Sequence, residues 1–156
     1  MMIDRSFRLA LVACTLASSA MFVSVSASAN SNLITKEFAV GCNGGDFGGR
    51  ATGVYTIDPK TRAISAHIQK YKIFRFDNKS AGNKANLNMG MSHSNTTTAM
   101  SVYSADNLRQ DDTWRSVSLS RWLHQVPGYP VSVGVEFVFD KSGKDPKCKA
   151  SAVLAQ

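Results

Sequence analysis

The sequence has few of the residues that build catalytic and metal sites. Its 156 residues include three cysteines, three histidines and two glutamates. The histidines form no H-x-H or H-x-x-x-H pair and no C-x-x-C is present, so the close spacing typical of metal ligands is missing. No G-x-S-x-G sequence marks an activated serine. We therefore expect a protein that is not an enzyme and that holds no metal ion or cofactor.

The composition also lacks the biases of fibrous and disordered chains. Four prolines and eleven glycines follow no fixed period, which excludes collagen and low-complexity repeats. Charged residues make up 19% of the chain against 44% hydrophobic residues, a balance typical of a globular protein. The length suits one domain. The net charge of +7 favours acidic partners or surfaces.

The first 29 residues predict a signal peptide of bacterial type. Arg5 and Arg8 precede an uncharged stretch at residues 9–25, and the small residues 26–29 supply the A-x-A pattern that signal peptidase requires. Serine and threonine dilute the stretch too much for a transmembrane helix. We predict cleavage after Ala29, no transmembrane segment, and a mature protein of residues 30–156 that is periplasmic or secreted.

The three cysteines have different expected roles. Cys14 ends a Leu-Val-Ala-Cys sequence that would be acylated in a lipoprotein, but few apolar residues precede it and the apolar run continues beyond it. We therefore do not favour a lipoprotein. After cleavage Cys42 and Cys148 are the only cysteines, and a lone pair in an exported chain predicts a disulfide bond. The bond would close a loop that spans most of the mature sequence.

Most of the mature sequence alternates between apolar and polar residues. The odd positions of 131–139, of 85–91 and of 117–123 are mainly apolar, as in half-buried β-strands. Helical spacing is confined to a single turn near residues 104–109, and a phase slip near Gln69 and Lys70 predicts a β-bulge. Cys42 and Cys148 both fall on inward positions of the first and last predicted strands. We predict an all-β, single-domain sandwich, or partly open barrel, of about eight mainly antiparallel strands.

A serine-rich segment is the most suggestive candidate binding strand. Trp114, Trp122 and the serines at 116, 118 and 120 share one phase, opposite to Val117, Leu119 and Leu123. Tryptophans on a polar face would offer flat apolar area and an N–H donor to a sugar ring or a protein. In the alternative, both indoles turn inward and pack at the rim of the core.

A glycine-rich segment at residues 41–50 is the second candidate. It holds five of the eleven glycines and carries Phe47 and Arg50. A phosphate-binding loop would need a helix after it, and here a strand follows. We interpret the segment as a hairpin connection, or as a binding loop with Phe47 at its tip. The residues expected to contact a partner are Phe47, Arg50, Asn95, Trp114, Arg121 and Trp122.

Three classes of function compete. The first is a non-enzymatic, protein-directed effector, such as a virulence factor or an inhibitor of an extracellular hydrolase, which presents loops at 43–50 and 93–98. The second is a module that binds a glycan or an anionic surface with Trp114 and Trp122 and with asparagine-rich loops. These asparagines are Asn78, Asn83, Asn86, Asn88 and Asn95. The third, a hydrolase, would need His93 or His124 beside Asp46 or Asp111.

The expected partner is therefore an extracellular protein or a glycan. Residues 70–76 mix basic and aromatic side chains as single-strand nucleic-acid binders do. Export makes nucleic acid an uncommon partner, however, and the basic residues are scattered over all predicted strands. We expect no nucleic-acid binding and assume a monomer. Among the protein-directed and glycan-directed functions, the sequence favours the protein-directed one only by analogy with other small disulfide-closed β-domains.

Overall fold

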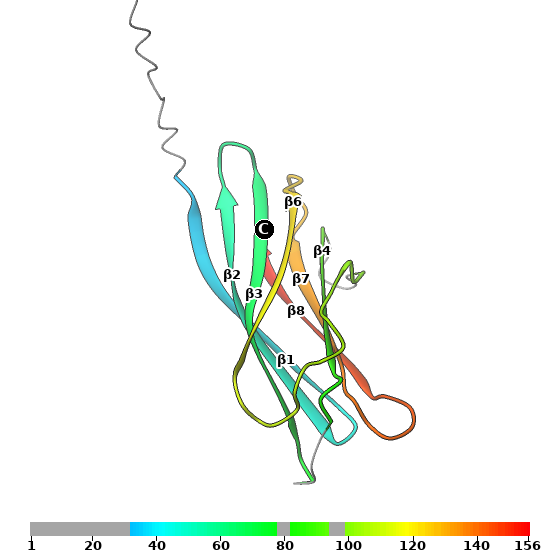
Figure 1. Cartoon of the computed structure of the whole chain (residues 1–156). Coiled ribbons are helices and arrows are strands. Elements are labelled where there is room, and N and C mark those ends of the chain that lie inside the picture. Colours follow the sequence, from blue (N-terminus) through cyan, green and yellow to red (C-terminus); the bar gives the residue numbers. More distant parts are fainter. Residues whose placement is uncertain (1–31, 78–81, 94–98) are drawn as a thin grey trace, which may run out of the picture.

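Two antiparallel sheets form the protein, as the alternating pattern predicts. The computed structural model describes residues 32–77, 82–93 and 99–156. The strands are β1 (Ile34–Gly44), β2 (Phe47–Asp58), β3 (Ala63–Arg75), β4 (Asn86–Ser92), β5 (Val102–Tyr103), β6 (Arg115–His124), β7 (Val131–Val138) and β8 (Lys147–Ala155). The first sheet has the order β1-β2-β3-β6 and the second β5-β4-β7-β8 (Figure 1). The prediction of a β-sandwich with eight antiparallel strands is confirmed.

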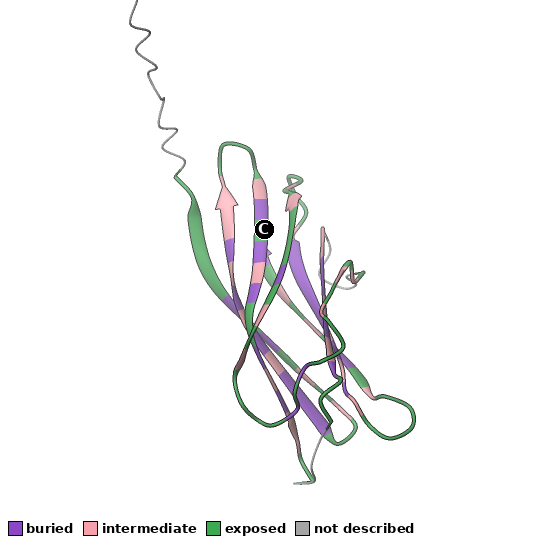
Figure 2. Ribbon diagram, viewed as in Figure 1, coloured by how far each residue is buried: buried purple, intermediate pink, exposed green. Residues whose placement is uncertain are grey.

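The core lies between the sheets and is built from the inward positions of each strand. β7 shows this most clearly, because Val131, Val133, Val135 and Phe137 are all fully buried, as is Phe139 just beyond it. Figure 2 shows buried segments within the strands of both sheets and exposed ones in the turns and along much of β1. Within the described residues, no helix is long and apolar enough to cross a bilayer. The predicted signal peptide lies outside those residues.

A β-bulge interrupts the pairing in the middle of the first sheet. Thr52 pairs with Lys70, whereas its neighbour Gly53 pairs with Ile68, so Gln69 is an extra residue on β3. The register between β3 and β6 shifts at the same point. The bulge predicted near Gln69 and Lys70 is confirmed, and it explains why the apolar phase of β3 slips there.

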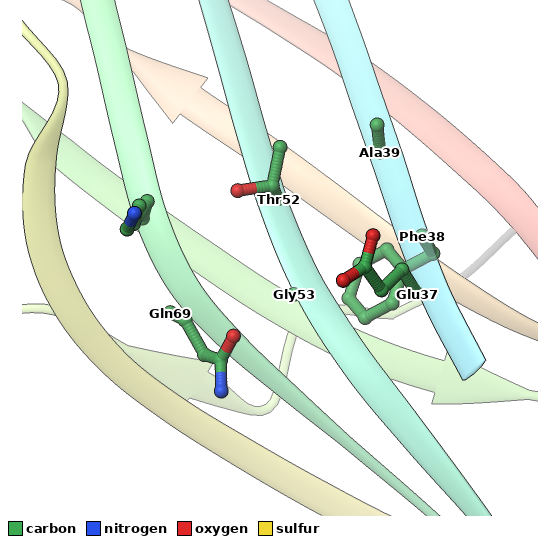
Figure 3. A pocket seen from close by; sticks show the side chains of 7 residues that line it. Glu37, Phe38, Ala39, Thr52, Gly53 and Gln69 are labelled. Carbon is green, nitrogen blue, oxygen red and sulfur yellow. The ribbon is translucent and has the colours of Figure 1, made fainter. Parts of the chain in front are cut away.

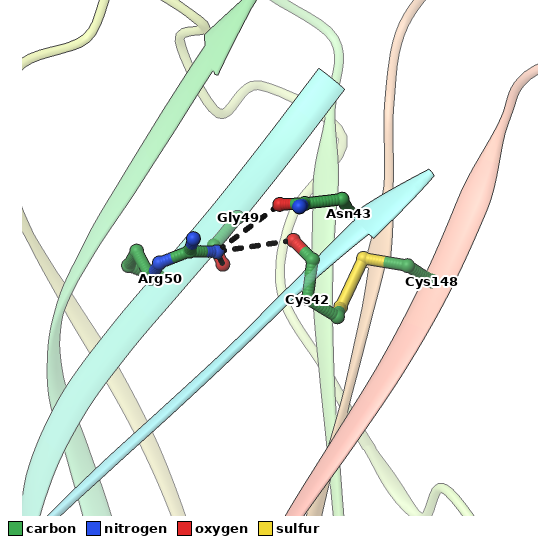
Figure 4. The surroundings of a disulfide bond; sticks show 5 residues. All are labelled: Cys42, Asn43, Gly49, Arg50 and Cys148. Carbon is green, nitrogen blue, oxygen red and sulfur yellow. Dashed lines mark hydrogen bonds between the residues drawn. A yellow bond between two sulfur atoms is a disulfide. The ribbon is translucent and has the colours of Figure 1, made fainter. Parts of the chain in front are cut away.

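A disulfide bond joins the two sheets along one side of the sandwich. Cys42 on β1 and Cys148 on β8 are bonded, with their Cα atoms 5.8 Å apart (Figure 4). β1 and β8 are edge strands of different sheets, so the bond connects two edges that share no backbone ladder. The predicted disulfide between the first and last strands is therefore confirmed, and it supports an oxidising, extracytoplasmic location.

Candidate binding face

The first sheet presents one side to solvent, and we call this side the outer face. The strand registers align its residues in rows, one of which runs from Thr35 through Thr56 and Ser65 to Trp122. The outer face comprises Thr35, Glu37, Ala39, Arg50, Thr52, Val54, Thr56, Ser65, His67, Lys70, Lys72, Phe74, Ser116, Ser118, Ser120 and Trp122. Most of these side chains are hydroxyl-bearing or basic, so the face offers hydrogen-bond donors and acceptors over a broad pleated surface.

Both tryptophans are exposed, and Trp122 lies on the outer face. Trp122 is 59% exposed, and Trp114, which directly precedes β6, is 47% exposed. The serines between them are exposed too, and the hydroxyl of Ser118 lies 3.1 Å from Nε2 of His67 on β3. The alternative of an inward indole is wrong for Trp122, because this residue pairs with Ser65 on the outer face. β6 thus presents Trp122 and a row of hydroxyl groups, and Trp114 lies exposed just before its first residue.

A shallow hollow lies on the outer face where the bulge breaks the sheet. Its volume is about 470 Å³, and its lining includes Glu37, Thr52, Gly53, Gln69 and Lys70. Figure 3 shows Glu37 on β1, Thr52 on β2 and Gln69 on β3 around it. Gly53 allows β2 and β3 to approach closely at the bulge, because a Cβ there would lie 2.1 Å from the carbonyl oxygen of His67. The sequence predicted the bulge but not the hollow, because a phase slip does not reveal which side chains surround it.

Basic and aromatic side chains form a fixed cluster at the other end of the outer face. The Arg50 guanidinium and the Lys72 ammonium each lie 5.4 Å from the centre of the Phe74 ring. Nη1 of Arg50 donates to the backbone oxygens of Cys42 at 3.2 Å and Gly49 at 2.8 Å. Lys72 also forms an ion pair with Asp112 at 2.7 Å. Arg50 is therefore held in place on the face beside the disulfide, as Figure 4 also shows.

The outer face carries side chains of both charges. Its basic residues are Arg50, Lys70 and Lys72, and the carboxylates at the face include Glu37 and Asp112, of which Asp112 is paired with Lys72. The scattered lysines and arginines of the sequence thus collect in part on one side of the sheet.

The glycine-rich segment is not a projecting loop. β1 and β2 are joined by a two-residue connection, Gly45–Asp46, in which Gly45 has φ +60° as the first central residue of a type II′ hairpin requires. Phe47 begins β2, is fully buried, and stacks on Phe139 with ring centres 5.1 Å apart. The prediction that Phe47 contacts a partner at a loop tip is therefore wrong. The glycines make the turn tight, and the ring fills the core.

Arg121 does not share the face of the tryptophans. It lies on the same side of β6 as Leu119 and Leu123, which pack against the core, and it pairs with Ala66 of β3. Its side chain is nevertheless exposed, because β6 is the edge strand of the first sheet. An inward charge on an edge strand blocks the pairing of that edge with another strand. Arg121 is thus placed to protect the edge rather than to bind with Trp114 and Trp122.

Replacing Arg121 with valine is expected to cause self-association. The variant leaves an apolar, β-branched side chain at an open strand edge, where a second chain can pair. Size-exclusion chromatography and light scattering should show larger species than for the wild type at equal concentration. The Arg121→Lys variant, which keeps the charge, should behave as the wild type does. Identical elution of the valine variant and the wild type would contradict this role.

The asparagines are not gathered beside the tryptophans. Asn86 and Asn88 lie on β4 in the second sheet, and Asn83 precedes that strand. Asn78 and Asn95 lie outside the described residues. Asn86 and Asn88 thus lie in a different sheet from Trp122, whereas Asn83 borders a pocket with Arg109 and Asp111. Gln69 brings an amide to the hollow of the outer face.

The residues considered for a hydrolase are held apart. Nε2 of His93 donates to the backbone oxygen of His124 at 2.6 Å, and His124 pairs with Ala63 at the start of β3. The backbone oxygen of Asp46 accepts from Phe76, just past the other end of β3. That strand has 13 residues, so its ends are about 40 Å apart at roughly 3.3 Å per residue. His124 and Asp46 therefore cannot act on one substrate bond.

Asp111 is paired with Arg115 rather than with a histidine. Arg115 donates to both carboxylate oxygens of Asp111, and these bonds lower the pKa of the Asp111 carboxyl below its ordinary value of 3.8. A lowered pKa means that the pair stabilises the fold at neutral pH, and this contribution disappears as the pH falls through that lowered pKa. Asp111 thus serves to hold Arg115 in place.

Comparison with known proteins adds no further assignment. The chain matches no family model, no curated protein sequence and no solved structure. Among residues 32–77, 82–93 and 99–156, no group of three or more histidine, cysteine, aspartate or glutamate side chains is placed to hold a metal ion.

Proposed function

We propose that this protein is a small exported binding protein whose outer face binds polysaccharide. The disulfide bond between β1 and β8 supports a place outside the cytoplasm, where polysaccharide chains are exposed to such a protein. The ligand lies along the first sheet, across β3 and β6, rather than in an enclosed cavity. The proposed activity is binding without covalent chemistry.

The observation that carries the proposal is the exposure of Trp114 and Trp122 at the two ends of a row of serines. Trp122 is eight positions beyond Trp114, or about 26 Å along an extended chain at roughly 3.3 Å per residue. This length suits an oligosaccharide segment rather than one sugar. Sugar rings have apolar C–H faces that pack on indole rings, and their hydroxyl groups match the serines and threonines of the face.

The hollow at the bulge adds a second point of contact. The side chains of Glu37, Thr52, Gln69 and Lys70 border it with a carboxylate, a hydroxyl, an amide and an ammonium group. Together these groups can accept from and donate to several sugar hydroxyls at once. The hollow lies on the same side of the sheet as Trp122, so one ligand can reach both features.

The protein-directed alternative has less support. It depended on projecting loops at 43–50 and 93–98, but Phe47 is buried and the first loop is a tight turn. Asn95 lies outside the described residues. Arg121, which would mark a protein contact, protects the β6 edge against pairing. We therefore place glycan binding ahead of a role as an effector or inhibitor.

Replacing Trp122 with alanine is expected to weaken polysaccharide binding by about tenfold or more, equivalent to about 1.4 kcal/mol. The two tryptophans are the only ones in the chain, so intrinsic fluorescence reports directly on this face. The mature, oxidised protein should be titrated with polygalacturonate and tested for co-sedimentation with chitin, cellulose and peptidoglycan. At least one polymer should bind and shift the fluorescence.

A matched control distinguishes a specific effect of the outer face from the effect of losing any exposed aromatic side chain. Tyr103 on β5 is 64% exposed and belongs to the second sheet. The Tyr103→Ala variant should bind as the wild type does, with an unchanged circular dichroism spectrum for both variants. Absence of binding to all four polymers, or equal binding by the wild type and Trp122→Ala, would overturn the proposal.

A further inference from the structure

A groove lies beside Trp114, where the chain enters β6. Its volume is about 490 Å³, and its lining includes Tyr71, Asn107, Arg109, Trp114, Arg115 and Ser116. These residues come from three separate parts of the chain, so no local sequence pattern indicates the groove. It opens at one end of the tryptophan and serine row that carries the proposed function.

Backbone hydrogen bonds fix both sides of the groove. Leu108 and Ala85 exchange two backbone bonds of 3.0 and 3.2 Å, which tie the segment before β6 to the segment before β4. The backbone N–H of Arg109 donates to the hydroxyl of Tyr71 at 3.0 Å. The backbone N–H of Asp112 donates to the carbonyl oxygen of Ile73 at 2.9 Å. The walls are therefore held before any ligand binds, which reduces the entropy lost on binding.

The two arginines of the groove differ in what they contact. Arg115 is paired with Asp111 through both carboxylate oxygens, so its charge is largely compensated. The guanidinium of Arg109 makes no hydrogen bond or ion pair with the described residues, and its side chain is exposed. Asp112, the next carboxylate along, is already paired with Lys72. Arg109 thus brings an uncompensated positive charge and five N–H donors to the groove.

We infer that this groove is the subsite for an acidic sugar, a uronic acid, within the polysaccharide. The Trp114 indole forms the wall against which the sugar ring packs. The Arg109 guanidinium binds the carboxylate, for which its planar pair of donors is suited. Asn107 and Ser116 border the groove with an amide and a hydroxyl for the sugar hydroxyl groups. This assignment rests on the proposed function and names the class of polysaccharide that the outer face takes.

The test compares one polymer with and without its charge. Fluorescence titrations should use sodium polygalacturonate and fully methyl-esterified polygalacturonate, which share a backbone but differ in carboxylate. The wild type should bind the charged polymer about tenfold more tightly. The Arg109→Gln variant should lose this difference and retain its affinity for the ester.

A charge-matched control excludes a general electrostatic effect. Lys144 lies exposed in the connection between β7 and β8 and is part of neither the outer face nor the groove, and Lys144→Gln removes the same unit of charge. This variant should keep the preference for the charged polymer. Equal wild-type affinity for the two polymers, or an equal loss in both variants, would overturn the uronic acid subsite. Trp122-dependent binding of a neutral polymer in that case would leave the proposed function standing.

Discussion

Replacing Phe47 with alanine is expected to destabilise the protein by about 3–5 kcal/mol, the usual cost of removing a buried phenylalanine ring. Phe47 has no exposed surface, and its ring stacks on Phe139 with centres 5.1 Å apart. The Arg75 guanidinium lies 4.8 Å from the centre of the same ring. The alanine variant would leave a cavity where the first hairpin meets the second sheet. Urea unfolding followed by circular dichroism measures the loss.

Phe76 provides the matched control for this substitution. It lies just beyond the end of β3 and is 53% exposed, so its ring is only partly withdrawn from water. Phe76→Ala should change the free energy of unfolding by no more than about 0.5–1 kcal/mol, as is usual for surface positions. If the two variants unfolded at the same urea concentration, Phe47 would not be the core residue described above.

Removing the disulfide bond is expected to lower the free energy of unfolding by about 2–5 kcal/mol. The bonded cysteines are separated by 106 residues in sequence, so the bond restricts most of the unfolded chain. In the folded state it joins β1 to β8, two edges that belong to different sheets. The Cys42→Ala, Cys148→Ala double variant should therefore unfold at clearly lower urea concentration than the oxidised wild type.

Reduction of the wild type tests the same effect without a change of side chain. With excess dithiothreitol the wild-type midpoint should approach that of the double variant, while the double variant should not respond. The outer face lies on β2, β3 and β6 as well as β1. Polysaccharide binding should therefore persist at urea concentrations at which the reduced protein is still folded. Equal stability of the oxidised and reduced wild type would show that the bond contributes nothing to the fold.

Alternation made the strand faces predictable from the sequence. Because successive side chains of a strand point to opposite sides, the positions of Val133, Val135 and Phe137 in the core follow from their spacing alone. The same rule placed Trp122 and the serines of β6 opposite Leu119, and both cysteines on inward positions. The bulge at Gln69 followed as well, since only an extra residue restores the phase of β3.

The burial of residues at strand edges and turns could not be predicted in the same way. Arg121 has the phase of a core residue, yet it is exposed because β6 has no neighbour on one side. Phe47 follows glycines typical of a loop, yet it starts a strand because Gly45 allows the chain to reverse within two residues. In both cases the environment depends on which strands lie next to each other, and strand order is not a local property.

The linear pattern predicted the sandwich class, the inward and outward sides of most strands, the disulfide pair and the outward side of Trp122. Each of these depends on spacing within one segment or on cysteine number, which a linear pattern contains. The order and register of the strands place basic and hydroxyl groups of four strands on one face and leave a hollow at the bulge. Folding also brings Tyr71, Arg109 and Trp114 to the border of one groove. The face, the hollow and the groove each combine residues that are far apart in the chain. These residues come together only when the strands pair in the folded protein.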